Sequence, residues 1–136
     1  MSFIQAQVKN TRELAMVDKA AGTVTVNREL LEAIVTTGLV QPADATTVRS
    51  EVAGVCNQAI SAADALTQVP VILADSSDTW IADTANNTNV AHNYQRMILS
   101  NSTTVNNNGT DNASGIVVQV EPYGLTGDRK IICRFV

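Results

Sequence analysis

The sequence is short of charged residues and has very few aromatic ones. Charged side chains make up 16 % of the 136 residues, against roughly 25 % in typical soluble proteins. Only three of them are lysines, the net charge is −4, and aromatic residues contribute 4 %. A nucleic-acid-binding protein needs a basic stripe, and the scattered basic residues here form none. We therefore expect no nucleic-acid partner.

Long apolar runs and targeting signals are also missing. The longest apolar run covers residues 69–74, whereas a membrane-spanning helix needs about 20 residues. The first ten residues contain no apolar stretch followed by a small-residue cleavage site, so they do not resemble a signal peptide. These features predict a protein that is made in a cytoplasm and has no membrane partner.

Residue types that carry chemistry are scarce and dispersed. Cys56 and Cys133 have apolar neighbours, which predicts reduced core cysteines. The single histidine, His92, has no nucleophile or orienting acid at a recognisable spacing. No glycine-rich phosphate loop and no paired zinc-ligand spacing occur. We expect a protein that is not an enzyme and holds no cofactor.

Three aspartates gather in one short stretch, at Asp75, Asp78 and Asp83. They lack the spacing of a calcium-binding loop, and carboxylates beside turn serines usually cap turns or face solvent. We therefore expect no metal site there. Trp80, in the same stretch, is expected to be a core anchor rather than a ligand-stacking residue.

Neutral amides replace charges in one region, where nine asparagines lie between Asn86 and Asn112. Amides and hydroxyls give solubility without a long-range electrostatic field, which suits a surface that packs beside many copies of itself. The same residues also favour hairpin turns, because asparagine bonds its own backbone and tolerates left-handed geometry. Both interpretations remain open at this level.

From residue 69 onward the pattern is that of β-strands separated by turns. Apolar and polar residues alternate in several short segments, and in the last one Ile131, Cys133 and Phe135 are expected inside. Residues 22–27 also alternate like a strand. The expected segments cover residues 69–74, 78–84, 94–101, 103–108, 115–122 and 130–136. They predict a small single domain, either a β-barrel or a β-sandwich.

Three stretches are ambiguous. Residues 11–21 fit a short helix capped by Thr11, or an arm that orders only on contact. Residues 28–38 fit a helix capped by Asn27 or a strand. Residues 44–62 carry apolar side chains at helical spacing, but Gly54 and several β-branched residues favour a strand.

Two long segments resemble the capsid decoration, or cement, proteins of tailed bacteriophages. In residues 52–84, "VAGVCNQAISAADALTQVPVILADSSDTWIADT", the stretch around "AADALTQVPV" leads to a strand containing "W.AD". In residues 92–136, a strand with arginine and apolar residues precedes "TVNNNGTD", and the chain ends in "KIICRFV". The resemblance covers about two-thirds of the chain and does not extend to residues 1–40.

The resemblance implies a structural virion protein on the outer surface of a phage capsid, where it bridges neighbouring capsomers. Its expected partners are the major capsid protein and copies of itself, as a dimer or trimer. It also implies that residues 51–61 form a strand and residues 62–68 a turn. A carbohydrate-binding or tail-fibre-type β module is the alternative function, and it would require aromatic platforms near the loops.

We therefore predict a mainly β fold with one or two short helices, with an α+β fold as the alternative. Residues 1–21 are expected to form an N-terminal arm and residues 22–136 the β-rich decoration domain. The arm is expected to be mobile until it meets the shell. Its candidate shell contacts are the apolar side chains of Phe3, Ile4, Val8, Leu14, Met16 and Val17.

Overall fold

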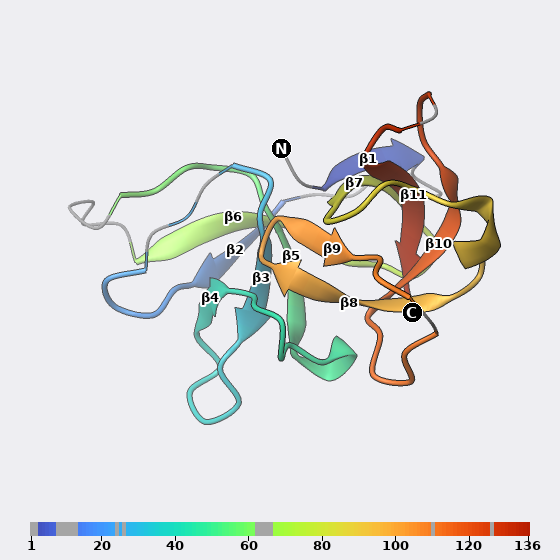
Figure 1. Ribbon diagram of the computed structural model, residues 1–136. Coiled ribbons are helices and arrows are strands. Elements are labelled where there is room, and N and C mark those ends of the chain that lie inside the picture. The colour runs from blue at the N-terminus through green and yellow to red at the C-terminus, as the bar shows by residue number, and fades with distance from the viewer. Residues whose placement is uncertain are drawn as a thin grey trace.

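The computed structural model describes residues 3–7, 14–23, 25, 27–61, 67–109, 111–125 and 127–136, and within them the protein is mainly β (Figure 1). These residues form eleven strands and two short 3₁₀ helices, η1 (Arg49–Glu51) and η2 (Val90–His92). The predicted mainly β class with one or two short helices is confirmed. None of the helices in the described part of the chain has the length and hydropathy of a membrane span.

The C-terminal half closes into a five-stranded barrel. Its strands follow the order β7-β11-β10-β8-β9, and β9 pairs in parallel with β7 to complete the ring. β1 (Ile4–Gln7) adds to this barrel by antiparallel pairing with β7. The barrel strands are β7 (Thr79–Thr84), β8 (Arg96–Asn101), β9 (Thr104–Asn106), β10 (Val117–Pro122) and β11 (Lys130–Phe135).

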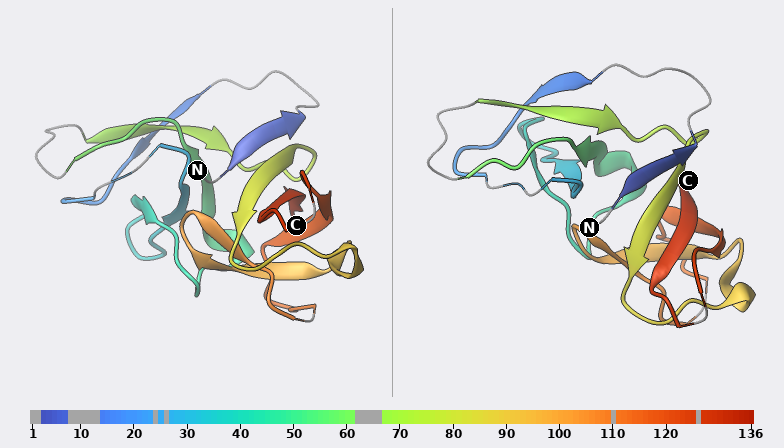
Figure 2. Two further views of the ribbon diagram at one scale, coloured as in Figure 1. Left: turned by 45° about the horizontal axis from the view of Figure 1, so that its top comes forward. Right: turned by 90° about the horizontal axis from the view of Figure 1, so that it is seen from above.

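A second sheet lies beside the barrel (Figure 2). Its order is β2-β6-β5-β3-β4, and all of its neighbouring strands are antiparallel. A single parallel bridge between Lys19 and Val40 connects its two outer strands, so the sheet curls strongly. The strands are β2 (Ala15–Asp18), β3 (Leu30–Ala33), β4 (Val40–Pro42), β5 (Val52–Cys56) and β6 (Gln68–Leu73).

Alternating side chains fill the barrel. Trp80 and Ala82 of β7 are fully buried while Ile81 between them is not, and β11 buries Ile131, Cys133 and Phe135. The Phe135 ring stacks on Phe3 and meets Trp80 edge-on, each with ring centroids 5.6 Å apart. This aromatic cluster joins residues from three strands or strand ends, and it confirms that Trp80 and Phe135 are core residues.

The second sheet separates two cores. Leu30 and Val55 belong to the barrel core, whereas their neighbours Leu31 and Cys56 belong to a smaller core inside the curled sheet. Successive residues of a strand point to opposite faces, so both faces of β3 and β5 are buried. Strands β3 and β5 therefore contribute side chains to both cores, which ties the barrel and the second sheet together.

Two of the ambiguous stretches, residues 28–38 and 44–62, adopt the extended alternative, whereas residues 15–18 form β2 rather than the short helix considered for residues 11–21. Residues 28–38 contain β3 followed by a turn, and residues 51–61 contain β5, as the resemblance implied. Thr25 forms an antiparallel bridge with Ile60 within the predicted 22–27 strand. Val24, Val26 and most of the predicted 62–68 turn lie outside the described residues.

The N-terminal segment differs from the expected arm. β1 pairs with β7 of the barrel and β2 pairs with β6 of the second sheet. Phe3 is fully buried, and its backbone N–H donates to the Arg28 carbonyl oxygen at 3.1 Å. The described residues of the 1–21 segment therefore belong to the fold, because their backbone groups complete both sheets.

We predict that Gly54→Ala lowers the free energy of unfolding by about 3 kcal/mol, because overpacking forces the neighbouring strand to shift. A Cβ atom at Gly54 would collide with the Ile72 backbone and the Val71 side chain on β6. Gly38→Ala is the matched control, since its φ is also positive at 72° but nothing lies within 4 Å. It should cost only about 1 kcal/mol. Chemical denaturation of both variants checks this, and equal losses would contradict it.

Candidate contact surfaces

The two cysteines and the histidine lie on three different elements: Cys56 on β5, Cys133 on β11 and His92 on η2. Burial raises the pKa of the Cys133 thiol to about 12, so at neutral pH it is an unreactive core group. The Cys56 thiol is buried and donates to the Gln58 carbonyl oxygen at 2.8 Å. His92 lies in η2, far in the sequence from both cysteines. Within the described ranges, no three metal-ligating side chains group together.

The aspartates have local structural partners. Asp75 Oδ1 accepts hydrogen bonds from the Ser77 backbone N–H at 2.8 Å and from the Ser77 hydroxyl at 2.6 Å. Asp83 pairs with the Lys130 ammonium at 2.6 Å. Asp78 is fully buried in the turn before β7. Two of the three carboxylates thus serve a turn and an ion pair.

Most of the asparagine-rich region serves its own turns. Asn89, Asn101, Asn106 and Asn112 each use the side-chain oxygen to accept a hydrogen bond from the backbone N–H two residues later. Such turns replace backbone partners that a loop cannot provide. The turn interpretation of these amides is therefore confirmed for these four positions.

Asn107 connects two loops. It is almost fully buried, its Oδ1 accepts from the Asn86 backbone N–H at 2.8 Å, and its Nδ2 donates to the carbonyl oxygens of Asn86 and Asn87. These three bonds fix the segment after β7 against the segment after β9. The side chain uses both its acceptor and its donors, so no other residue type can replace it fully.

We predict that Asn107→Asp lowers the free energy of unfolding by about 2–4 kcal/mol, because it loses two donor bonds and buries a charge facing carbonyl oxygens. The exposed neighbour Asn108 provides the control, and Asn108→Asp should change the free energy by less than about 0.5 kcal/mol. Urea denaturation at pH 7 measures both. A loss at Asn107 no larger than that at Asn108 would contradict the connecting role.

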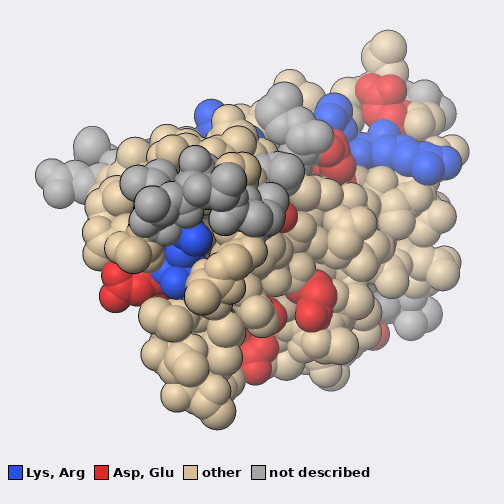
Figure 3. All heavy atoms as spheres, turned by 90° about the vertical axis from the view of Figure 1, so that its left-hand side faces the viewer, with Lys and Arg blue, Asp and Glu red and all other residues tan. Residues whose placement is uncertain are grey.

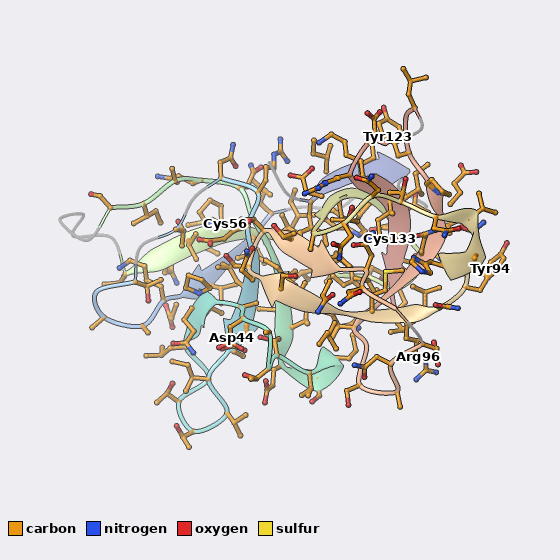
Figure 4. The ribbon with its side chains drawn as sticks, viewed as in Figure 1. Asp44, Cys56, Tyr94, Arg96, Tyr123 and Cys133 are labelled. Atoms are coloured by element: carbon orange, nitrogen blue, oxygen red, sulfur yellow. The ribbon has the colours of Figure 1, made fainter. Side chains whose placement is uncertain are left out.

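The aromatic residues do not form a ligand platform. Trp80 is fully buried, so it cannot stack on a ligand. Tyr94 and Tyr123 are 72 % and 43 % exposed, but they lie on different elements and Figure 4 shows them well apart. The described residues therefore lack the adjacent rings with which a carbohydrate-binding module holds a sugar.

An apolar strip is exposed at the outer strand of the second sheet. Leu14, directly before β2, is 48 % exposed, and Met16 within it is 57 % exposed. Met16 lies opposite Pro70 of β6, and Ile72 on the same face of β6 packs against the barrel core. The β2 strip, defined as Leu14, Met16 and Pro70, is thus the uncovered continuation of a buried sheet face.

The predicted shell contacts divide into exposed and buried residues. Leu14 and Met16 are exposed, whereas Phe3 is fully buried and available to no partner in this conformation. Val17 is half-buried against the smaller core, and Ile4 is half-buried in β1. Val8 lies outside the described residues. The structure therefore leaves Leu14 and Met16 as the accessible members of the set.

Charged side chains are sparse on one side of the molecule. Figure 3 shows that Lys, Arg, Asp and Glu atoms form a few separate groups on this largely uncharged face. The carboxylate that follows the strip, Asp18, accepts a hydrogen bond from the Gln68 side chain at 3.0 Å. A contact made here would bury apolar and neutral polar groups, with little desolvation of charge.

A second surface feature is a cleft that contains two arginines. Its volume is about 370 Å³, and it lies between η1, the start of β8, the 111–115 loop and the end of β11. We call it the arginine cleft; its lining residues are Val48, Arg49, Ser50, Arg96, Ala113, Ser114, Gly115 and Val136. No sequence pattern indicates this site, because 46 residues separate Arg49 from Arg96.

Comparison with known proteins identifies no relative. The chain matches no protein-family model, no curated protein and no solved structure. The β2 strip, the arginine cleft and the neutral surface are therefore the features on which a proposal of function rests.

Proposed function

We propose that the protein is a capsid decoration protein, which binds the outside of a phage head and stabilises it by bridging neighbouring capsomers. The observation that carries this proposal is the β2 strip, in which the apolar side chains of Leu14 and Met16 are exposed on an outer strand of the second sheet. Binding through apolar area suits a structural protein, because it requires neither a cofactor nor a catalytic group. The resemblance of residues 52–84 and 92–136 to cement proteins supports the same function.

The strip alone is smaller than a stable interface. A standard protein–protein interface buries about 1,600 Å² in total, which corresponds to roughly 20–30 residues on each side. We propose that the remaining area comes from contacts with further copies of the protein, as a dimer or trimer on the shell. A low surface charge favours this arrangement, because closely packed copies with a large net charge would repel one another.

The described residues do not show the side-chain arrangement that a carbohydrate-binding module or a hydrolase would need. A carbohydrate-binding or tail-fibre-type module would use exposed aromatic rings, and Tyr94 and Tyr123 lie apart. A hydrolase would need His92 beside a nucleophile, whereas both thiols are buried core groups. The proposal therefore includes that the protein is not an enzyme.

We predict that the double variant Leu14→Ser, Met16→Ser binds expanded, undecorated heads about 10- to 100-fold more weakly than the unchanged protein. Its fold should persist, because both side chains are about half exposed. Val35→Ser is the matched control, since Val35 is 80 % exposed on the β3–β4 turn, outside the strip. Sedimentation of heads with labelled protein measures the affinity, and circular dichroism checks the fold.

Substitution is a sharper test than deletion of the N-terminal segment. Deleting residues 1–20 would remove β1, β2 and the buried Phe3 ring, so lost binding would follow from unfolding alone. If the folded double variant binds heads as tightly as the control, the β2 strip is not the shell contact. A glycan array that retains the protein would instead favour the carbohydrate-binding module.

A further inference from the structure

The arginine cleft places two positive groups in one recess of a protein whose net charge is −4. Arg49 comes from η1 and Arg96 from the first position of β8. Figure 4 shows Arg96 at the lower edge of the barrel, close to the C-terminal end of the chain, and Val136 also lines the cleft. Both arginines line this recess, and within the described residues neither forms an ion pair with a carboxylate side chain.

Arg49 is held in place and still has donors to offer. Its Nη2 donates to the Ala74 carbonyl oxygen at 2.8 Å, and its guanidinium carbon lies 5.8 Å from the centre of the Phe135 ring. Its Nε is buried and makes no hydrogen bond. A guanidinium has five N–H donors, and a buried donor without a partner is costly. An acceptor brought within hydrogen-bonding distance of this N–H would remove this cost.

The opposite wall of the cleft is formed by the 111–115 loop, which is held against β8. The Arg96 backbone N–H donates to Asp111 Oδ1 at 2.6 Å, and the Asn112 N–H donates to the Arg96 carbonyl oxygen at 3.0 Å. Gly115 packs so closely on Arg96 that a Cβ atom would overlap it. These contacts fix the 111–115 loop against β8, so the cleft exists before a ligand arrives and little ordering is needed on binding.

The charges of the cleft favour a single carboxylate over a polyanion. Two guanidinium groups can hold one carboxylate by charge-assisted hydrogen bonds. Glu51 follows Arg49 within η1 and Asp111 contacts the backbone of Arg96, so negative groups flank the arginines. A nucleic acid or another polyanion would meet these carboxylates and the negative net charge of the protein, and it would need more basic residues.

We propose that the arginine cleft binds an aspartate or glutamate side chain of a neighbouring polypeptide. The cleft volume of about 370 Å³ accommodates a side chain together with part of its backbone. The Ser50 and Ser114 residues in the lining add neutral hydrogen-bonding groups next to the two cations. This inference concerns a site other than the β2 strip, and it holds whether or not the neighbouring polypeptide belongs to a phage shell.

The test is a nuclear magnetic resonance titration of the full chain with two blocked pentapeptides, Gly-Ser-Asp-Ser-Gly and Gly-Ser-Asn-Ser-Gly, and with inorganic phosphate. We expect the aspartate peptide to shift the Gly115 and Ala113 amide signals and the Arg49 Nε–H signal. The asparagine peptide should shift them far less, because it lacks the charge that both arginines recognise. Phosphate should bind more weakly than the aspartate peptide, because Glu51 and Asp111 oppose a second negative charge.

Arg96→Gln should weaken binding of the aspartate peptide roughly threefold to tenfold, as expected for the loss of one exposed charge pair. Arg134→Gln is the matched control, because Arg134 is exposed on β11 and does not line the cleft. Equal shifts with both peptides, no shift with either, or tighter binding of phosphate would overturn the proposal. An unchanged affinity in Arg96→Gln would overturn it as well.

Discussion

Ending the chain after Lys130 should leave an unfolded polypeptide. The truncation removes β11, which pairs with β10 on one side and with β7 on the other, so the barrel opens. It also removes the buried side chains of Ile131, Cys133 and Phe135. Burying three such side chains contributes about 5–9 kcal/mol, which is comparable to the total stability of a small domain. Far-ultraviolet circular dichroism and amide-signal dispersion would report the loss.

The matched control for this truncation is removal of Val136 alone. That residue is exposed and donates one backbone hydrogen bond to the Ile116 carbonyl oxygen, so its removal should cost only about 1 kcal/mol. A chain that ends at Lys130 and still unfolds cooperatively would show that β11 is not required for the barrel.

Trp80→Ala should lower the free energy of unfolding by about 3–5 kcal/mol, because it leaves a cavity in the barrel core. The Trp80 ring is fully buried and meets Phe135 edge-on, with an angle of 72° between the rings. Trp80→Phe is the control. It keeps an aromatic ring and removes an indole N–H that has no hydrogen-bond partner, so it should cost less than half as much.

Denaturant unfolding followed by circular dichroism measures both Trp80 variants, since each removes the sequence's single tryptophan and its fluorescence. The two costs should differ by more than about 1.5 kcal/mol, because only alanine leaves a large cavity. Near-native stability of Trp80→Ala would contradict the packing of the barrel core.

Strands with one buried face could be predicted from the sequence. β7 and β11 alternate strictly between buried and less buried residues, and this alternation was visible in the sequence pattern. β3 was ambiguous because Leu30 and Leu31 are both buried, one in each core. A strand that faces two cores has no polar face, so its pattern cannot be distinguished from that of a buried helix.

The contacts of the N-terminal segment could not be predicted from the sequence, for a different reason. Nothing local to Phe3 indicates that its ring stacks on Phe135 at the other end of the chain. Leu14 and Met16 were named as candidate shell contacts of an arm, but their place on the outer strand of a sheet was not predicted. Contacts between distant segments depend on the closed topology, which periodicity alone does not encode.

The β2 strip and the arginine cleft also differ in how far they could be predicted from the sequence. Two of the three residues of the β2 strip, Leu14 and Met16, lie in one short segment and were named as contact candidates from the sequence, whereas Pro70 of the partner strand was not. The arginine cleft joins η1, β8, a loop and the chain end, and no spacing connects these elements in the sequence. The role of Asn107 was equally hidden, since its partners lie about twenty residues earlier.

The abundance of asparagine now has a structural explanation that is separate from function. Four side chains close their own turns and Asn107 joins two loops. An aspartate can close the same kind of turn, as Asp75 does, but a carboxylate in place of the buried Asn107 amide would have to be desolvated and would lose two donor bonds. The neutral amides of this region are compatible with dense packing on a shell.

The most direct test of the proposed function is the composition of purified phage heads. Intact heads would be separated on a density gradient, and the ratio of this protein to the major shell protein measured by quantitative mass spectrometry. Our account predicts a fixed ratio that persists through washing and repeated gradients, with the protein accessible to antibodies on the outside of the head. A protein that is absent from the heads, or whose ratio falls towards zero on washing, would contradict the decoration function.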